Sequence, residues 1–249
     1  MIIKRHIAYG KFYNLFFFFL ITMGYSFCLA NTAVTPKDIL NDKWWKNRHE
    51  NILNKKITNP KLILIGNSII NDLELIDRKE VRDKYLNKYK TLNLGFSGDR
   101  TENVIWRLLN GEIDGIHPKV AVVLIGTNNT DGNNYPTINT APELAEGIWK
   151  ICQIIKKKLP ETQILLLGIS PFGQNLPNYR NTINQNVNKL ISKFPEKDNT
   201  IHYLYIGNIF LKEDGRIDSK LMPDYLHPGV EGDLLWFQTM QPYIEVLMK

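Results

Sequence analysis

The chain has 249 residues, which is long enough for one α/β domain with a complete hydrophobic core. It has 31 Lys and Arg residues against 25 Asp and Glu residues, a formal charge of +6, but three of the basic residues and none of the acidic ones lie within residues 1–30. Without that segment, the remaining 219 residues carry a formal charge of only +3, which gives no reason to expect a nucleic-acid partner.

The N-terminal segment has the pattern of a secretory signal peptide. A basic start within residues 4–11 precedes the apolar stretch 15–21, and the small residue Ala30 follows shortly after it. We therefore predict that residues 1–30 are a signal peptide and that the protein is secreted or periplasmic. The apolar stretch is marginal for a membrane-spanning helix, so an uncleaved N-terminal anchor is the open alternative.

Residues 31–249 show no internal repeat, linker or change of composition, and we predict that they form a single domain. The polar lead-in, residues 31–60, contains the adjacent Trp44 and Trp45. These rings are expected to cover an edge of the sheet, with the lining of a binding cleft as the alternative. Cys152 is the only cysteine after the signal segment, which excludes a disulfide within the domain and favours a buried helical thiol.

Apolar runs alternate with longer amphipathic segments along this domain. The runs have the composition of buried parallel strands, and they cover residues 61–65, 91–94, 120–125, 163–168 and 202–206. The amphipathic segments are predicted to be helices, and they cover residues 73–88, 101–110, 141–158, 178–194 and 230–248. This alternation predicts a three-layer α/β/α domain with a five-stranded parallel sheet.

Polar residues follow these strands at the points where the strands end. Ser68 comes after the first strand, Gly98 after the second and Asn128 after the third. Asp224 and His227 lie between the fifth strand and the last predicted helix. Because function collects at the carboxyl ends of the strands of an open parallel sheet, we expect these residues to share one edge.

A serine, a histidine and an aspartate can form the triad of an acyl-transfer enzyme. His227 is the only histidine that the sequence places in a loop at the carboxyl edge of the sheet. Asp224, three residues earlier, can accept a hydrogen bond from one ring nitrogen and leave the other nitrogen facing Ser68. Asp72 and Asp99 are the alternative acid partners, although no histidine lies close to either in sequence.

The charge that develops after attack on an ester carbonyl needs hydrogen-bond donors. The backbone amides of Ser68 and Gly98 lie at turns before predicted helices, and the side-chain amide of Asn128 is the third candidate donor. The sequence therefore predicts an oxyanion hole made of Ser68, Gly98 and Asn128. This chemistry needs no cluster of ligands to activate water, so no metal site is predicted.

These sequence blocks, in this order, resemble the SGNH (GDSL-type) hydrolase superfamily of esterases and lipases. Within the superfamily, the chain is most similar to the catalytic subunits of the intracellular platelet-activating-factor acetylhydrolases and their bacterial relatives. The resemblance covers residues 42–247, and its motifs lie at residues 93–99, 101–108, 110–119, 126–129 and 224–227.

The resemblance implies a flavodoxin-like fold that needs neither a metal nor a cofactor. It also implies that Ser68 is the nucleophile, that His227 is the base and that Asp224 orients the base. Gly98 and Asn128 would complete the oxyanion hole with the Ser68 amide. Relatives of this kind form dimers, so the resemblance also suggests a homodimer.

One position departs from the Gly-Asp-Ser sequence that is usual in these hydrolases, because this chain has Gly66-Asn67-Ser68. Asparagine keeps the turn-forming and hydrogen-bond-accepting capacity of aspartate but lacks its charge. With the side chain of Asn67 taken as exposed, we expect the change to be tolerated, and an Asn67→Asp substitution to alter activity by no more than about tenfold.

The sequence thus predicts a secreted or periplasmic serine esterase that removes short acyl groups, acetyl above all, through an acyl-enzyme intermediate. The alternatives are a carbohydrate O-deacetylase acting on an acetylated glycan and a hydrolase of phospholipids or lysophospholipids. A lipid substrate would bring the protein into peripheral contact with a membrane. A catalytically silent binding module with the same fold is a further alternative, which the complete set of site residues argues against.

Overall fold

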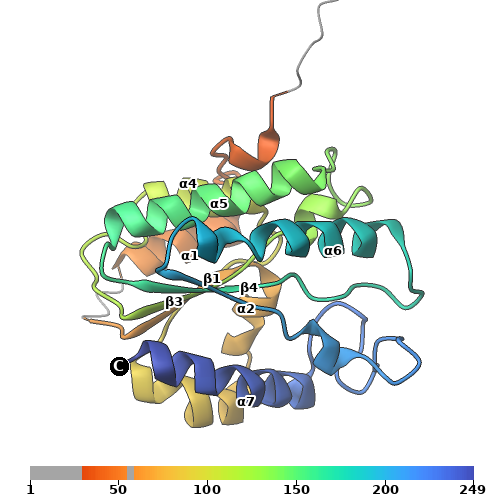
Figure 1. Cartoon of the computed structure of the whole chain (residues 1–249). Coiled ribbons are helices and arrows are strands. Elements are labelled where there is room, and N and C mark those ends of the chain that lie inside the picture. Colours follow the sequence, from red (N-terminus) through yellow and green to blue (C-terminus); the bar gives the residue numbers. More distant parts are fainter. Residues whose placement is uncertain (1–29, 55–58) are drawn as a thin grey trace, which may run out of the picture. The chain divides into compact units, whose positions relative to one another are not determined.

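The computed structural model describes residues 30–54 and 59–249, and residues 31–249 form one compact unit (Figure 1). The predicted signal peptide, residues 1–30, lies outside the described residues except for Ala30. Within the described ranges, no helix has the length and apolar character needed to cross a membrane.

Five strands form one parallel sheet in the order β2-β1-β3-β4-β5. Their bounds are β1 Leu62–Gly66, β2 Leu92–Gly95, β3 Val120–Leu124, β4 Gln163–Leu167 and β5 Ile201–Leu204. This strand order is that of flavodoxin-like sheets, whose connections reverse direction between the first and third strands. The predicted five-stranded α/β fold is therefore confirmed, with strand ends that differ by a residue or two from the predicted runs.

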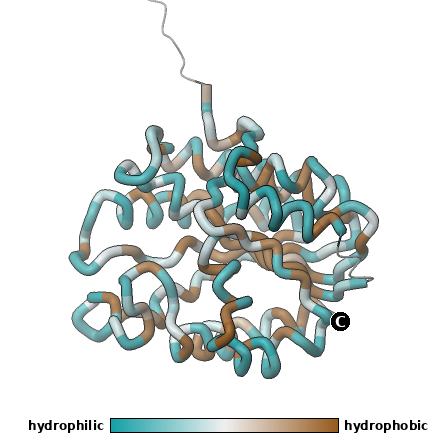
Figure 2. Tube along the Cα trace, turned by 180° about the vertical axis from the view of Figure 1, so that it is seen from behind, coloured by the Kyte–Doolittle hydropathy of each residue, from teal (hydrophilic) through white to brown (hydrophobic). Residues whose placement is uncertain are grey.

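The central strands β1 and β3 are apolar throughout because helices cover both faces of the sheet. In β1, Ile63 and Ile65 pack into the core on one face, whereas Leu62 and Leu64 pack into the core on the other. This alternation follows from the two-residue period of a strand, and burial on both faces explains the lack of polar positions. Figure 2 shows the mostly hydrophobic colour of the sheet between helices that alternate between hydrophobic and hydrophilic residues.

The longer helices form the two outer layers (Figure 1). The layer on one face contains α1 Lys43–Asn54, α4 Thr101–Leu109, α5 Ala141–Lys158 and α6 Tyr179–Ile191, and the layer on the other contains α7 Val230–Leu247. The short helical turns are η1 Thr32–Val34, α2 Ser68–Asn71, η2 Asp72–Glu74, η3 Ile76–Arg78, α3 Lys79–Val81, η4 Arg82–Leu86, η5 Asn87–Tyr89, η6 Thr127–Thr130, η7 Phe194–Glu196 and η8 Gly207–Phe210.

The structure corrects the predicted helix over residues 73–88, which is a series of short turns. Leu75 has an extended conformation with φ of −59° and ψ of 151°, and this interrupts the helix. The guanidinium of Arg82 donates to the carbonyl oxygens of Leu73 and Leu75, which therefore need no helical partners. Val81 and Tyr85 still face the core, and this burial produced the amphipathic pattern.

The polar lead-in contains a helix that the sequence did not predict, α1, of which only Trp45 and His49 are buried. So narrow a buried stripe gives a weak periodic signal. Trp45 lies in the interior, whereas Trp44 is 46% exposed and packs edge-to-face on Phe96 beside the end of strand β2. Cys152 is free and buried in α5, as predicted, and burial raises the pKa of its thiol to about 12.

Candidate active site

Ser68 lies at the carboxyl edge of the sheet, in the turn between strand β1 and the short helix α2. Asn67 caps this helix, because its side-chain oxygen accepts a hydrogen bond of 3.1 Å from the amide of Ile69. The helix packs directly against the end of β2, where a Cβ atom on Gly95 would lie 2.3 Å from the backbone nitrogen of Asn71. Glycine at position 95 therefore permits the close approach that places Ser68 at the edge.

The three predicted triad residues lie together and are joined by hydrogen bonds. The Ser68 hydroxyl oxygen is 2.8 Å from Nε2 of His227, and Nδ1 of His227 is 2.6 Å from Oδ2 of Asp224. With a carboxylate beside Nδ1, that nitrogen carries the proton, and Nε2 is left to accept the serine proton. The geometry is therefore that of a nucleophile, a base and an orienting acid.

Asp224 also orders the backbone of the loop that carries the histidine. Its Oδ1 accepts hydrogen bonds from the amides of Leu226 at 3.0 Å and His227 at 2.7 Å. Burial favours a raised pKa for Asp224, but the hydrogen bonds from His227 and Leu226 outweigh it and hold this pKa below its ordinary value. Tyr225, which follows Asp224 in the chain, has a φ of +60°, which is unusual for a residue with a side chain.

A buried arginine anchors the same loop from the other side. Arg78 donates from Nη2 to the carbonyl oxygen of Pro228 at 3.0 Å and from Nε to Oδ2 of Asp233 at 2.6 Å. Burial raises the pKa of Asp233 to about 7, although its ion pair with Arg78 opposes this shift. Sequence reasoning missed Arg78, because its partners, Pro228 in the loop and Asp233 in α7, are 150 and 155 residues away.

The structure does not support the alternative acid partners. Asp99 is fully buried and bonds to Trp45 and Arg107, and Asp72 accepts a hydrogen bond from its neighbour Asn71. In the described part of the chain, neither carboxylate is hydrogen-bonded to His227. Asp224 is therefore the acid partner that the geometry favours.

The predicted oxyanion-hole donors follow strands β1, β2 and β3 at the same edge. Gly98 has a φ of +83°, a conformation that glycine adopts without strain. Asn128 belongs to η6 and donates one side-chain N–H to the carbonyl oxygen of Asp99 at 2.9 Å. Its amide group has a second N–H, so it can still donate to an oxyanion.

Replacing Asn128 by alanine should lower kcat by about a hundredfold or more and change KM much less, because an oxyanion-hole donor meets charge that exists mainly in the transition state. Asn129→Ala should instead lower the melting temperature and change kcat much less. Asn129 is fully buried, and its side chain binds Thr101 and Asn139 at distances of 2.9 to 3.0 Å. Steady-state kinetics and thermal melts of both variants test this, and equal kinetic losses would remove the reason for choosing Asn128.

The structure corrects one premise about Asn67, because its side chain is only 1% exposed. In an Asn67→Asp variant, the new carboxyl would keep the bond to the Ile69 amide, so activity should still stay within about tenfold at pH 6. Burial disfavours the charged form and raises the folded-state pKa of such a carboxyl above its unfolded value. Stability should therefore be lost as pH rises through that folded-state pKa. Thermal melts from pH 5 to 8 should show a steeper decline for the variant than for the parent protein.

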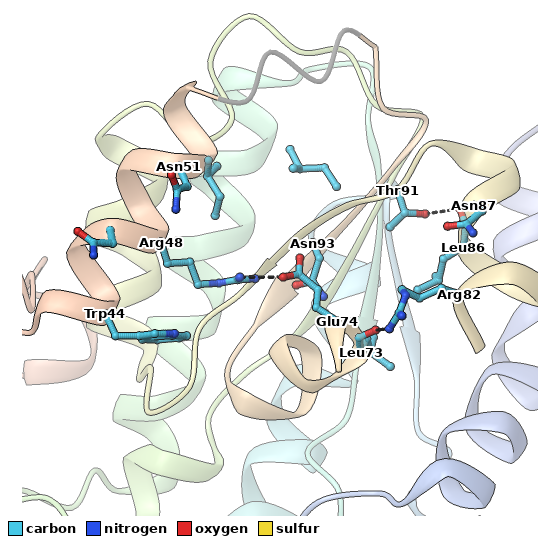
Figure 3. Close-up of a pocket in the computed structure, with 13 residues that line it drawn as sticks. Trp44, Arg48, Asn51, Leu73, Glu74, Arg82, Leu86, Asn87, Thr91 and Asn93 are labelled. Atoms are coloured by element: carbon cyan, nitrogen blue, oxygen red, sulfur yellow. Dashed lines mark hydrogen bonds and ion pairs between the residues drawn. The ribbon is translucent and has the colours of Figure 1, made fainter. Parts of the chain in front are cut away.

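A cavity of about 300 Å³ lies on the outer side of edge strand β2, and the triad does not line it (Figure 3). Trp44 and Arg48 of α1 form one wall, and Arg48 reaches Glu74 on the opposite wall at a distance of 2.9 Å (Figure 3). Trp44 thus lines a cavity beside the edge of the sheet, while Trp45 is part of the core. Among the described residues, no group of three or more histidine, cysteine and acidic side chains could hold a metal ion.

A model of the GDSL-like lipase/acylhydrolase family matches residues 65–235. The chain is 35% identical over 224 residues to the platelet-activating factor acetylhydrolase IB subunit alpha2 of Homo sapiens, with 88% of this chain and 92% of the relative covered. It is 32% identical over 199 residues to the corresponding alpha1 subunit of Bos taurus, with 80% of this chain and 81% of that subunit covered.

Solved structures share the fold at lower sequence identity. A GDSL-like lipase from Bacteroides thetaiotaomicron superposes with a TM-score of 0.59 at 16% identity, covering 82% of this chain and 96% of that one. An acetylxylan esterase from Geobacillus stearothermophilus superposes with a TM-score of 0.56 at 14% identity, covering 75% of this chain and 95% of that one. The family match spans the segment from Ser68 to His227 and the related subunits align over most of the chain, so this protein belongs to the GDSL-like lipase/acylhydrolase family and is an ester hydrolase.

Proposed function

We propose that the protein hydrolyses esters of short acyl groups, acetyl above all, with Ser68 as the nucleophile. The observation that carries this proposal is the continuous hydrogen-bonded chain from Ser68 through His227 to Asp224. The acetylhydrolase names of the relatives at 35% and 32% identity support an acetyl substrate.

In the proposed mechanism, the Ser68 oxygen attacks the ester carbonyl while its proton passes to Nε2 of His227. The negative charge of Asp224 stabilises the imidazolium that forms. The amides of Ser68 and Gly98 and the side chain of Asn128 would hold the oxyanion. His227 then gives the proton to the leaving alcohol, and a water molecule, activated by the same histidine, releases the acid and restores the Ser68 hydroxyl.

A cavity of about 10 Å³ is lined by sequence neighbours of the triad, although Ser68 and His227 do not line it themselves. Its walls include Asn67 and Ile69, which flank Ser68 in sequence, and Leu226, which precedes His227. We propose that the methyl of an acetyl ester enters this cavity, because such a volume admits about one water-sized group. Longer acyl chains would have to displace walls that include Ile169, which is only 3% exposed.

A series of p-nitrophenyl esters from acetate to octanoate tests the proposal. We expect kcat/KM to be highest for acetate or propionate and to fall by about tenfold or more for each methylene that the cavity cannot accept. Leu226→Ala should widen the cavity and shift the optimum toward butyrate. Val246→Ala, at a site that is 64% exposed on α7, is the control and should leave the profile unchanged. A flat profile across the series would contradict the short-acyl preference.

The alcohol part of the ester distinguishes the substrate classes that the sequence left open. The 35% identity to a platelet-activating factor acetylhydrolase subunit favours an acetylated phospholipid over an acetylated glycan. The likeness to an acetylxylan esterase, at 14% identity, shows only that the two proteins share a fold. Release of acetate from an acetylated glycerophospholipid and from acetylated xylo-oligosaccharides, measured side by side, decides between them.

We also propose that the protein is exported, because residues 1–30 have the basic start, apolar core and small end residue of a signal peptide. The mass of the protein recovered from the producing cell distinguishes a cleaved chain from one that retains its N-terminal segment as an anchor. The homodimer suggested by the family resemblance remains a prediction, which sedimentation at several protein concentrations can check.

A further inference from the structure

The turn that carries Gly98 is held by a buried cluster that the reaction itself does not use. Asp99 is fully buried, and its Oδ1 accepts a hydrogen bond of 2.8 Å from the indole of Trp45. Its Oδ2 accepts a hydrogen bond of 2.8 Å from Nε of Arg107, which is also fully buried. The carboxylate therefore joins the turn to α1 and α4, which contribute these two donors.

Two further buried residues, Glu112 and His49, extend the cluster and hold Arg107 in place. Arg107 also pairs with Glu112, and Glu112 is 2.8 Å from Nδ1 of His49. Glu112 and His49 are 4% and 5% exposed. Burial raises the pKa of Asp99 to about 6, although Arg107 and Trp45 oppose the shift. The ionised carboxylate therefore needs both donors in its buried position.

The backbone of the same turn is held from the side of strand β3. The carbonyl oxygen of Gly98 accepts a hydrogen bond of 2.6 Å from the hydroxyl of Tyr135. The carbonyl oxygen of Asp99 accepts one of 2.9 Å from the side chain of Asn128. The amide of Gly98 itself has no hydrogen-bond partner among the described residues, so it is free to donate to a substrate.

We propose that Asp99 and Tyr135 are positioning residues, which hold the Gly98 amide where it can donate to the oxyanion. The inference rests on the proposed serine mechanism. A donor of this kind is effective only at 2.7 to 3.1 Å from the position of the oxyanion. Glycine is the residue with the greatest backbone freedom, so the position of its amide must be set by contacts on either side of it.

Tyr135→Phe is the sharpest test, because it removes one hydroxyl from a half-buried side chain. We expect kcat for p-nitrophenyl acetate to fall by about tenfold with KM within twofold, less than the loss of an oxyanion donor itself. Affinity for a methyl trifluoromethyl ketone should fall by a similar factor, because its adduct with Ser68 places an oxyanion in the same site. A merely structural role would lower the melting temperature and leave kcat and inhibitor affinity unchanged.

Tyr179→Phe is the matched control. The Tyr179 hydroxyl accepts a hydrogen bond from the amide of Gly132, in the segment that also carries Tyr135, but it does not contact Gly98. This variant should keep the kcat and inhibitor affinity of the parent protein. Asp99→Asn, if it folds, should lose more than tenfold in kcat, because it breaks the ion pair with Arg107.

The outcomes separate this inference from the proposed function. Unchanged kcat and inhibitor affinity in Tyr135→Phe, in a parent protein that hydrolyses the ester through Ser68, would overturn the positioning role alone. Equal losses in Tyr135→Phe and Tyr179→Phe would also overturn it, because the effect would then belong to the whole segment. A parent protein that hydrolyses no ester, or that does so without Ser68, would instead contradict the proposed function.

Discussion

Replacing Ser68 by alanine should abolish ester hydrolysis while leaving the free energy of unfolding almost unchanged. The Ser68 hydroxyl is hydrogen-bonded to His227, and the cap of helix α2 is supplied by Asn67, so the substitution removes no helix cap. In the proposed mechanism no other group can form the acyl-enzyme. Loss of the nucleophile in such a triad lowers turnover by about a millionfold. Rates measured with p-nitrophenyl acetate and thermal melts monitored by circular dichroism give both quantities.

Ser192→Ala is the control for this substitution. Ser192 is an exposed residue at the end of α6, and its hydroxyl donates to the carbonyl oxygen of Lys189. Its loss should leave hydrolysis at the parental rate. Activity above a small fraction of the parental rate in folded Ser68→Ala protein would show that the acyl-enzyme mechanism is wrong.

Removing the base or its orienting acid should have the second largest effect. The imidazole of His227 must be neutral to accept the Ser68 proton, so kcat/KM should rise with pH through a single ionisation and then reach a plateau. His227→Ala should remove this rise together with most of the rate. Asp224→Asn should keep the fold but leave the imidazole in the wrong tautomer, a change that costs about 10⁴ in kcat in serine proteases.

The pKa of Asp224 determines how this residue contributes to the pH dependence of kcat/KM and of stability. Because this pKa lies below its ordinary value, Asp224 stays ionised throughout the rise in kcat/KM and adds no second step to it. The stability that its hydrogen bonds contribute is present above the unfolded-state pKa and is lost as pH falls through the folded-state value. The pH profile of kcat/KM and melts under acid conditions measure these two effects separately.

His117→Ala and His202→Ala are the controls for the pH profile. His202 is hydrogen-bonded to Gln163 at 2.8 Å, and His117 precedes strand β3 at the opposite edge of the sheet. Both variants should keep the rise in kcat/KM. A rise that persists in His227→Ala would show that another group is the base. Inhibition by EDTA that added metal reverses would make His227 and Asp224 metal ligands instead.

Local signals account for what the sequence predicted of the fold. The bounds of α5 agree with the predicted segment 141–158, because Thr140 and Glu143 form a capping box at its start and Pro160 follows its end. Strands β1 and β3 were predicted because burial on both faces leaves uninterrupted apolar runs. The prediction of one helix over residues 73–88 was wrong. The side chain of Arg82 binds carbonyl groups seven and nine residues away, and a helical pattern does not report such contacts.

In the site, too, short-range patterns were predictable from the sequence and contacts between distant residues were not. The sequence places Asp224 three residues before His227, and the rule that parallel strands end at one edge brings Ser68 to them. The supporting contacts could not be predicted in this way. Tyr135 reaches Gly98 across 37 residues and Trp45 reaches Asp99 across 54, and no periodic or short-range pattern reports such pairs. Adjacent aromatic residues before the first strand were the only available signal for Trp45.

Covalent labelling of the nucleophile tests the central claim most directly. The protein is incubated with a fluorophosphonate and digested, and the modified peptide is identified by mass spectrometry. We predict complete loss of ester hydrolysis with one label per chain, located on Ser68, and no label on the Ser68→Ala variant. A label on another residue with loss of activity, or full activity in protein whose Ser68 is labelled, would contradict the assignment of Ser68 as the nucleophile.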